Sequence, residues 1–167
     1  HRERCREQGE SQGRELTRVT RILGVDLGLK RTGLALSDEL RLTARALANL
    51  TPKSRAEDVA FLVALIEREA VGDVVIGLAS LKSGDDSAMA KRARGFAQAL
   101  TDALRAASVT ARVHLVDEHG TSKAAAARLV ESGVKKSRRK AELDGEVARG
   151  LVLDFAQQVE RIENSPR

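Results

Sequence analysis

The chain has 167 residues, a formal net charge of +5 and 42% hydrophobic residues, which fits one globular domain with a proper core. No apolar run approaches the roughly 20 residues that span a bilayer, and the single cysteine excludes an intrachain disulfide. The basic surplus favours a polyanionic partner, whereas the aromatic content of 2% argues against a protein that holds single strands by base stacking.

The first 72 residues are predicted to form a flexible arm, three strands and a helix. Residues 1–18 mix arginine with glutamate and are almost free of apolar side chains, so we expect a flexible arm outside the fold. The predicted strands are Val19–Leu27, Thr32–Ser37 and Ala44–Leu50. Ser54 and Glu57 form a capping-box pattern that opens a helix to Ala70, and Gly72 is expected to stop it.

The remainder predicts two strands, each reached through a helix. The elements in order are a fully apolar strand Val74–Ile76, a helix Ser87–Ala107, a strand Ala111–Val116, a short helix Thr121–Ser132 and a last helix Ala141–Ile162. Strands reached through helices should run parallel to the first strand by right-handed crossovers. The pattern therefore predicts one α/β domain over residues 19–162, followed by a short tail at 163–167.

Three carboxylates are candidates for a metal site. Asp26 ends the first strand, Glu118 follows the last strand, and Asp144 lies on the face of the last helix that should pack on the sheet. The carboxyl ends of parallel strands share one edge, where α/β sheets place their ligands. Carboxylate oxygens suit Mg²⁺ or Mn²⁺, and two such ions can assist in-line displacement at a phosphodiester. Taken singly, each has a plainer interpretation: a turn former, a surface residue, and a carboxylate at a helix N-terminus.

Basic side chains gather at two places near these carboxylates. Lys30 and Arg31 lie in the turn after Asp26, and five more precede the last helix as a loop: Lys135, Lys136, Arg138, Arg139 and Lys140. We expect these residues to contact nucleic-acid phosphates, although a solvated surface would look the same. Gly28 and Gly33 are expected to serve backbone geometry around the turn.

Other side chains receive simpler predictions. Phe61, Phe96 and Phe155 fall in apolar helical patterns and are expected in the core, which would leave little aromatic surface for stacking. His114 alternates into the last strand and is expected to be structural. His119, beside Glu118, could relay protons, although histidine more often has a surface role.

The segment around Asp26 resembles a known family. The pattern D-x-G-x-K-R-x-G-x-A-x-S-D is present as Asp26, Gly28, Lys30, Arg31, Gly33, Ala35, Ser37 and Asp38. It resembles the opening of the YqgF/RuvX family, bacterial RNase H-like proteins described as Holliday junction resolvases and as pre-16S rRNA processing nucleases. The resemblance continues through Val75–Leu78, Val116–Glu118 and Lys140–Asp144, and covers about residues 21 to 156.

The resemblance carries expectations about fold and activity. It implies an RNase H-like five-stranded mixed sheet of order 3-2-1-4-5 with strand 2 antiparallel, flanked by helices, and a catalytic, metal-binding triad at Asp26, Glu118 and Asp144. It also implies a nuclease for rRNA processing and ribosome biogenesis or for DNA recombination and repair, with water as nucleophile. The single cysteine fits a reducing cytoplasm, so we expect a cytoplasmic protein. The chain departs from the family pattern at Ala79-Ser80 and at His119-Gly120. At His119 the family pattern has an arginine, which could bind phosphate through two hydrogen bonds as histidine cannot.

One alternative to a nuclease stays open, and a second is discounted. The chain could be a catalytically weak nucleic-acid-binding factor for ribosome assembly, in which the carboxylates only maintain the fold. A sugar-kinase phosphate motif is discounted because that fold needs two such domains. Symmetrical cutting of a junction would require a two-fold homodimer, for which the sequence carries no diagnostic patch.

Overall fold

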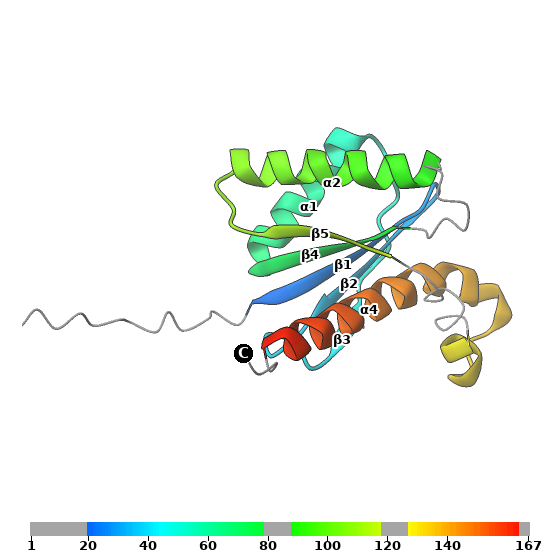
Figure 1. Ribbon diagram of the computed structural model, residues 1–167. Helices are drawn as coiled ribbons and strands as arrows, with labels where there is room; N and C mark the ends of the chain where they lie inside the picture. The colour runs from blue at the N-terminus through cyan, green and yellow to red at the C-terminus, as the bar shows by residue number, and fades with distance from the viewer. Residues whose placement is uncertain (1–19, 79–87, 118–126, 164–167) are drawn as a thin grey trace, which may run out of the picture.

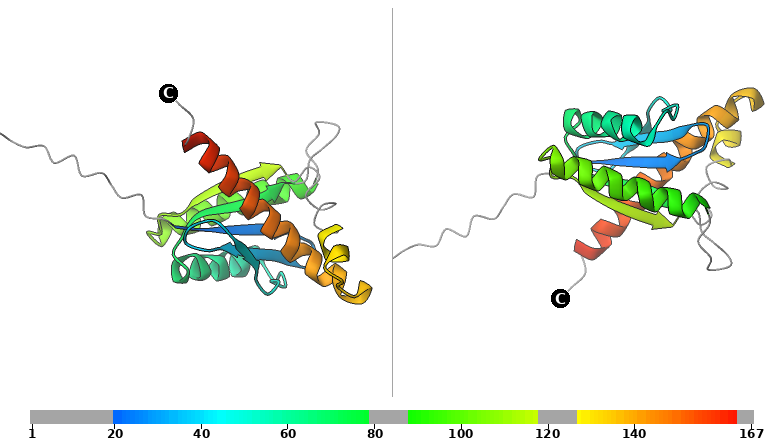
Figure 2. Two further views of the ribbon diagram at one scale, coloured as in Figure 1. Left: turned by 90° about the horizontal axis from the view of Figure 1, so that it is seen from below. Right: turned by 90° about the horizontal axis from the view of Figure 1, so that it is seen from above.

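The computed structural model describes residues 20–78, 88–117 and 127–163, and it has three layers (Figure 1). The strands are β1 Arg21–Leu27, β2 Thr32–Ser37, β3 Ala44–Ala46, β4 Val71–Leu78 and β5 Arg112–Asp117. The long helices are α1 Arg55–Arg68, α2 Ala88–Ala106 and α4 Lys136–Glu163. Residues 127–131 are also helical. Helices α1 and α2 cover one face of the sheet, and α4 runs across the other (Figure 2).

The sheet topology confirms the predicted order. The five strands lie in the order β3-β2-β1-β4-β5, with β1 and β2 antiparallel and with β1, β4 and β5 parallel. The connection from β1 to β4 passes through α1, and the connection from β4 to β5 passes through α2. Both helices lie on the same face of the sheet, as expected when both crossovers are right-handed. The carboxyl ends of β1, β4 and β5 therefore share an edge of the sheet.

Alternating side chains of β1 supply two separate apolar clusters. Leu23 and Val25 point into the cluster under α1 and α2, together with Leu100. Ile22 points to the opposite face and packs with Leu151 of α4. All five are buried, and full burial of such a side chain stabilises the fold by about 1.5–3 kcal/mol. By the same alternation, Asp26 belongs to the α4 face.

Helix α4 lies close to β1 and β2 because these strands carry glycine where the helix crosses. A Cβ at Gly24 would meet the carbonyl oxygen of Ala148 and lie 2.6 Å from Val152 Cγ2. A Cβ at Gly33 would meet the carbonyl oxygen of Asp144 and lie 2.8 Å from its Cβ. The main chain of α4 therefore rests directly on the main chain of β1 and β2.

Several predicted boundaries in the first half were wrong. The third strand is regular only over Ala44–Ala46, and the segment rejoins the sheet as a single bridge between Leu50 and Thr32. Helix α1 begins at the predicted cap, where Ser54 Oγ accepts a hydrogen bond from Glu57 N at 3.1 Å.

The end of α1 also differs from the prediction. The helix ends at Arg68, and Ala70 takes the left-handed conformation with φ 53°. Gly72 does not stop it, because β4 begins at Val71 and Gly72 lies within this strand, against the Thr20 side chain. The apolar run Val74–Ile76 is thus the middle of a longer strand.

Two predictions about helical residues were also wrong. The basic run was expected as a loop before a helix starting at Ala141, but α4 begins at Lys136. Lysine and arginine are good helix formers, and the turn falls earlier, at Gly133 with φ 75°. Phe61 is 48% exposed on α1, whereas Phe96 is buried as predicted.

No helix in the described ranges has an apolar stretch of the length that a bilayer crossing requires.

Candidate functional site

The register of the parallel strands shows which residues share the edge at the end of β1. Val25 pairs with Ile76, and Gly77 pairs with Val116. Asp26 is therefore level with the last residues of β4 and β5. Glu118 comes directly after β5 in the chain, but it lies outside the described residues. The two departures from the family pattern, Ala79-Ser80 and His119-Gly120, also lie outside them. The predicted role of Glu118 stays a prediction.

Asp26 and Asp144 approach each other across Gly33. Asp26 pairs with Gly33 in the β1–β2 ladder, and opposite residues of an antiparallel pair have Cβ positions about 5 Å apart on the same face. Asp144 Cβ lies 2.8 Å from the point where a Gly33 Cβ would stand. Two carboxylates that are 118 residues apart in sequence are thus neighbours on the α4 face, at the edge where β1 ends.

Arg31 is a cation beside this pair. Its Nε donates a hydrogen bond to Asp144 Oδ2 at 3.3 Å, and the two side chains are 34% and 25% exposed. Asp26 is half-buried. From the sequence we expect Arg31 to contact nucleic-acid phosphate, and no sequence pattern indicates its contact with Asp144.

The helix-terminus interpretation of Asp144 does not fit its position. With α4 starting at Lys136, Asp144 is the ninth residue of the helix. The favourable interaction of a carboxylate with the helix dipole falls off within the first turn. The place of Asp144 is better explained by its neighbours Asp26 and Arg31 than by the helix end.

The carboxylates suit a hard divalent cation by their chemistry. Carboxylate oxygens are the ligands that Mg²⁺ and Mn²⁺ prefer, and adjacent carboxylates disfavour each other's ionisation unless a cation lies between them. No cluster of three potential ligands occurs within the described ranges, which leave out Glu118. Asp26 and Asp144 therefore lie together on one face, and Glu118, the third residue of the predicted set, lies outside the described residues.

The connection between β1 and β2 is held from both faces of the sheet. On the α2 side, Arg92 Nη1 donates to the carbonyl oxygen of Gly28 at 2.9 Å. On the α4 side, Arg31 contacts Asp144. A Cβ at Gly28 would meet the carbonyl oxygen of Arg31, so this turn needs glycine. The role of Arg92 is not predicted from the sequence, because one arginine in a basic helix carries no distinguishing pattern.

The basic segment lies at the beginning of α4. Lys135, Lys136 and Arg138 are exposed, whereas Arg139 is half-buried with its Nε donating to the carbonyl of Val134 at 2.8 Å. Lys140 lies in the next turn of the helix. An open groove of about 620 Å³ passes along this segment and is lined by Ser132, Gly133, Val134, Lys135, Arg138 and Glu142.

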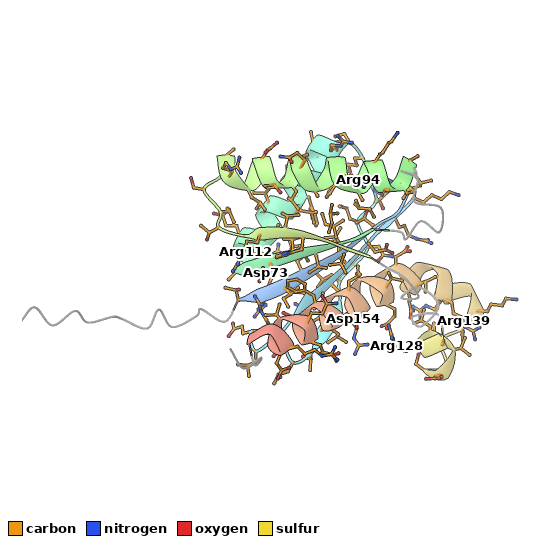
Figure 3. The ribbon with its side chains drawn as sticks, in the orientation of Figure 1. Asp73, Arg94, Arg112, Arg128, Arg139 and Asp154 are labelled. Atoms are coloured by element: carbon orange, nitrogen blue, oxygen red, sulfur yellow. The ribbon has the colours of Figure 1, made fainter. Side chains whose placement is uncertain are left out.

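A buried carboxylate with basic partners lies at the opposite end of the sheet. Asp73 is buried, and it accepts a hydrogen bond from Arg41 at 2.7 Å and contacts His114 Nε2 at 2.8 Å. Burial raises the pKa of Asp73, but the hydrogen bonds from His114 and Arg41 and the Arg41 charge outweigh this effect and lower it. In Figure 3, Asp73 and Arg112 lie far from Arg139, at the other end of the molecule.

His114 is well placed for the structural role that was predicted for it. Besides Asp73, it contacts the ring of Phe155 on α4, with ring centroids 4.7 Å apart. Asp73 itself was not singled out from the sequence, although an aspartate at the start of a buried strand signals a partnered carboxylate.

The sequence matches a known family. The model of a family described as "RuvX: Holliday junction resolvase" matches residues 20–157. A protein of Maridesulfovibrio salexigens named "Putative pre-16S rRNA nuclease" is 36% identical over 134 residues, which are 80% of this chain and 95% of that protein. A protein of the same name from Anaeromyxobacter sp. is 38% identical over 128 residues, 77% of this chain and 90% of that protein.

Solved structures share the fold at low sequence identity. Thermus thermophilus RuvC in complex with a Holliday junction substrate superposes with a TM-score of 0.54 at 18% identity, covering 84% of this chain and 96% of that one. The yeast mitochondrial Holliday junction resolvase Ydc2 gives a TM-score of 0.51 at 14% identity, covering 87% and 82%. These likenesses show the RNase H-like fold.

Proposed function

The chain belongs to the RuvX (YqgF) family, and from this premise we propose that it is a divalent-metal-dependent nuclease acting on structured nucleic acid. Its substrate would be pre-16S rRNA, as the names of its relatives suggest, or a four-way DNA junction, as the family description suggests. On the rRNA precursor, we place the cut at the 5′ end. The observation that carries the proposal is the approach of Asp26 and Asp144 across Gly33.

The proposed metal ligands are Asp26, Asp144 and Glu118. Asp26 would serve both ions of a two-ion Mg²⁺ or Mn²⁺ site, and each of the others would complete one. Bound divalent ions supply Lewis-acid stabilisation of the phosphodiester and make water a stronger nucleophile near neutral pH. In-line attack by water with departure of the 3′ oxygen would leave a 3′-hydroxyl and a 5′-phosphate.

The chain's own cations would position the nucleic acid. Lys30 is exposed on the turn beside Asp26, and Arg31 lies next to Asp144. The basic segment continues this surface along the start of α4. The first turn of α4 contains no acidic residue and instead carries positive charge at the positive end of the helix dipole. A bound phosphate would relieve this repulsion, which supports a polyanionic partner for the segment.

Partner and compartment follow from the same proposal. The partner is nucleic acid, and the compartment is the cytoplasm, where rRNA precursors of bacteria are processed. Cutting a four-way junction symmetrically would require two active sites related by a two-fold axis, and therefore a homodimer. Processing of a single-stranded rRNA end would not require a homodimer.

One observation favours a second candidate, a nucleic-acid-binding factor that does not cleave. Asp144 is already paired with Arg31 inside the protein, as it would be if the carboxylate only stabilised the fold. In that case the basic segment would still bind nucleic acid, and divalent ions would not matter.

A cleavage panel separates the two candidates. The purified chain is incubated with Mn²⁺ and with a four-way junction, a linear duplex, single strands or a precursor-rRNA fragment. We expect cleavage of one structured substrate, its loss with a chelator, and its loss in Asp26→Asn. Asp154→Asn is the matched control, because Asp154 is an exposed carboxylate on α4. Cleavage by Asp26→Asn at the wild-type rate would contradict the assignment.

A further inference from the structure

Arg31 holds a carboxylate that the proposed nuclease needs for metal. Its Nε donates to Asp144 Oδ2, so one oxygen of a proposed metal ligand already accepts a hydrogen bond from a cation within the protein. A divalent ion on Asp144 would compete with the guanidinium for this oxygen and would repel its positive charge. Arg31 therefore cannot keep this contact at full strength in a metal-bound protein.

The Arg31–Asp144 contact is suited to exchange. Its hydrogen bond of 3.3 Å exceeds the usual N–H···O range, and both side chains are about one-quarter to one-third exposed. The Arg41–Asp73 pair at the other end of the same face is 2.7 Å long, and its side chains are 20% and 9% exposed. A partly exposed ion pair contributes less to stability than a buried one, so breaking the Arg31–Asp144 pair costs the fold less than breaking the Arg41–Asp73 pair would.

Only the side chain of Arg31 has to move, because the main chain around it is fixed. Gly28 is held by Arg92 on one side of Arg31. Thr32 on the other side is buried, and its N–H donates to the carbonyl oxygen of Leu50 at 2.8 Å. Arg31 can therefore exchange one anionic partner for another without rearrangement of the hairpin.

We propose that Arg31 couples metal binding to nucleic-acid binding: it neutralises Asp144 in the metal-free protein and passes to a phosphate of the nucleic acid when metal is bound. This inference rests on the proposed function. Because a coupling between two ligands is reciprocal, metal should strengthen nucleic-acid binding by the same factor as nucleic acid strengthens metal binding. Arg31 would then disfavour metal occupancy until a substrate is present.

The test measures Mn²⁺ affinity directly. Isothermal titration of the full chain with Mn²⁺, without nucleic acid, compares wild type with Arg31→Gln and Lys30→Gln. Both variants lose one positive charge from the same hairpin, but the structure pairs only Arg31 with Asp144. We expect Arg31→Gln to bind Mn²⁺ about 3- to 10-fold more tightly and Lys30→Gln to stay within about twofold of wild type.

A second titration adds the four-way junction or the rRNA fragment, made with phosphorothioate linkages that resist cleavage. The nucleic acid should tighten Mn²⁺ binding in wild type and do so several-fold less in Arg31→Gln. Equal or weaker Mn²⁺ binding by Arg31→Gln than by wild type, with an unchanged circular dichroism spectrum, would overturn the inference. An equal increase of Mn²⁺ affinity in Lys30→Gln would also overturn the inference, because it would show that the loss of any positive charge from the hairpin has the same effect.

Asp144→Asn separates failure of the inference from failure of the proposed function. If wild type binds Mn²⁺ and Asp144→Asn binds it at least tenfold more weakly, the metal site stands, and the Arg31→Gln result alone decides the coupling. If wild type binds no Mn²⁺ with or without nucleic acid, the proposed function and the coupling both fail.

Discussion

The two ends of the sheet face covered by α4 each carry an arginine–aspartate pair, and the two pairs differ in how they are built. At the end where β1 starts, Arg41 and Asp73 are 2.7 Å apart and largely buried, and Asp73 also contacts His114. At the end where β1 stops, Arg31 and Asp144 are 3.3 Å apart and partly exposed, with Asp26 beside them.

The difference indicates two roles for the same pair of residue types. A buried carboxylate with two hydrogen-bond donors is costly to leave without one of them and has little room for a further ligand. A partly exposed carboxylate with a long contact to one arginine contributes little stability and can accept another cation. Substitutions at the two ends should therefore affect different measurements.

The largest effect is expected at the end that carries Asp26. Asp144→Asn should lower the rate of Mn²⁺-dependent cleavage by about 10³-fold or more, because a metal ligand is lost. Its free energy of unfolding should change by less than about 1 kcal/mol, because the pair is partly exposed. The cleavage rate is measured under single-turnover conditions, and the free energy of unfolding is measured by urea denaturation. A loss of stability without loss of cleavage would reverse the roles of the two ends.

The next effect belongs to the buried pair. Arg41→Ala should lower the free energy of unfolding by about 2–3 kcal/mol, because Asp73 stays buried with one partner fewer. The cleavage rate per folded molecule should not change. The chain has no tryptophan or tyrosine, so urea unfolding is best followed by far-ultraviolet circular dichroism.

Arg112→Ala is the control for this prediction. Arg112 lies 3.8 Å from the same carboxylate but is 82% exposed, and its removal should change the free energy of unfolding by less than about 0.5 kcal/mol. A similar loss of unfolding free energy in Arg41→Ala and Arg112→Ala would contradict the prediction, because it would show that the burial of the arginine does not decide its contribution.

A smaller effect is expected where α2 holds the hairpin. Arg92→Ala removes the hydrogen bond to Gly28 and should lower the turnover number about tenfold, because the hairpin that bears Arg31 becomes less well positioned. The Michaelis constant should change less. Lys91→Ala, which removes the exposed neighbouring charge, should behave as wild type. An equal loss in both variants would point to the charge of α2 rather than to the hydrogen bond.

The smallest effect is the pH dependence of the buried pair. The pKa of Asp73 is lowered in the folded protein, so its ionised form stabilises the fold above the ordinary aspartate pKa of about 3.9. This contribution is lost as the pH falls through the lowered value. Asp73→Asn should therefore be less stable than wild type at neutral pH, and the difference should shrink in acid. A difference that is constant from neutral pH to acid would contradict the lowered pKa.

The fold and the position of Asp144 could be predicted from the sequence because both follow from local periodicity. Asp144 lies four and eight residues before Ala148 and Val152, which pack on the sheet, so its face was determined by helical spacing. The partner of Arg31 could not be predicted, since it depends on how closely α4 approaches β2. The start of α4 differs from the prediction because a run of charged residues resembles a loop in pattern, whereas lysine and arginine have high helix propensity.

Gly24 and Gly33 have a consequence for how this site tolerates change. Because α4 rests on the strands through main-chain atoms, the separation of Asp26 and Asp144 is set by backbone contact and not by the sizes of core side chains. Relatives can therefore vary the apolar residues of this interface while the two carboxylates keep their spacing. A single added methyl group at position 33 would wedge the layers apart at the point where chemistry is proposed to occur.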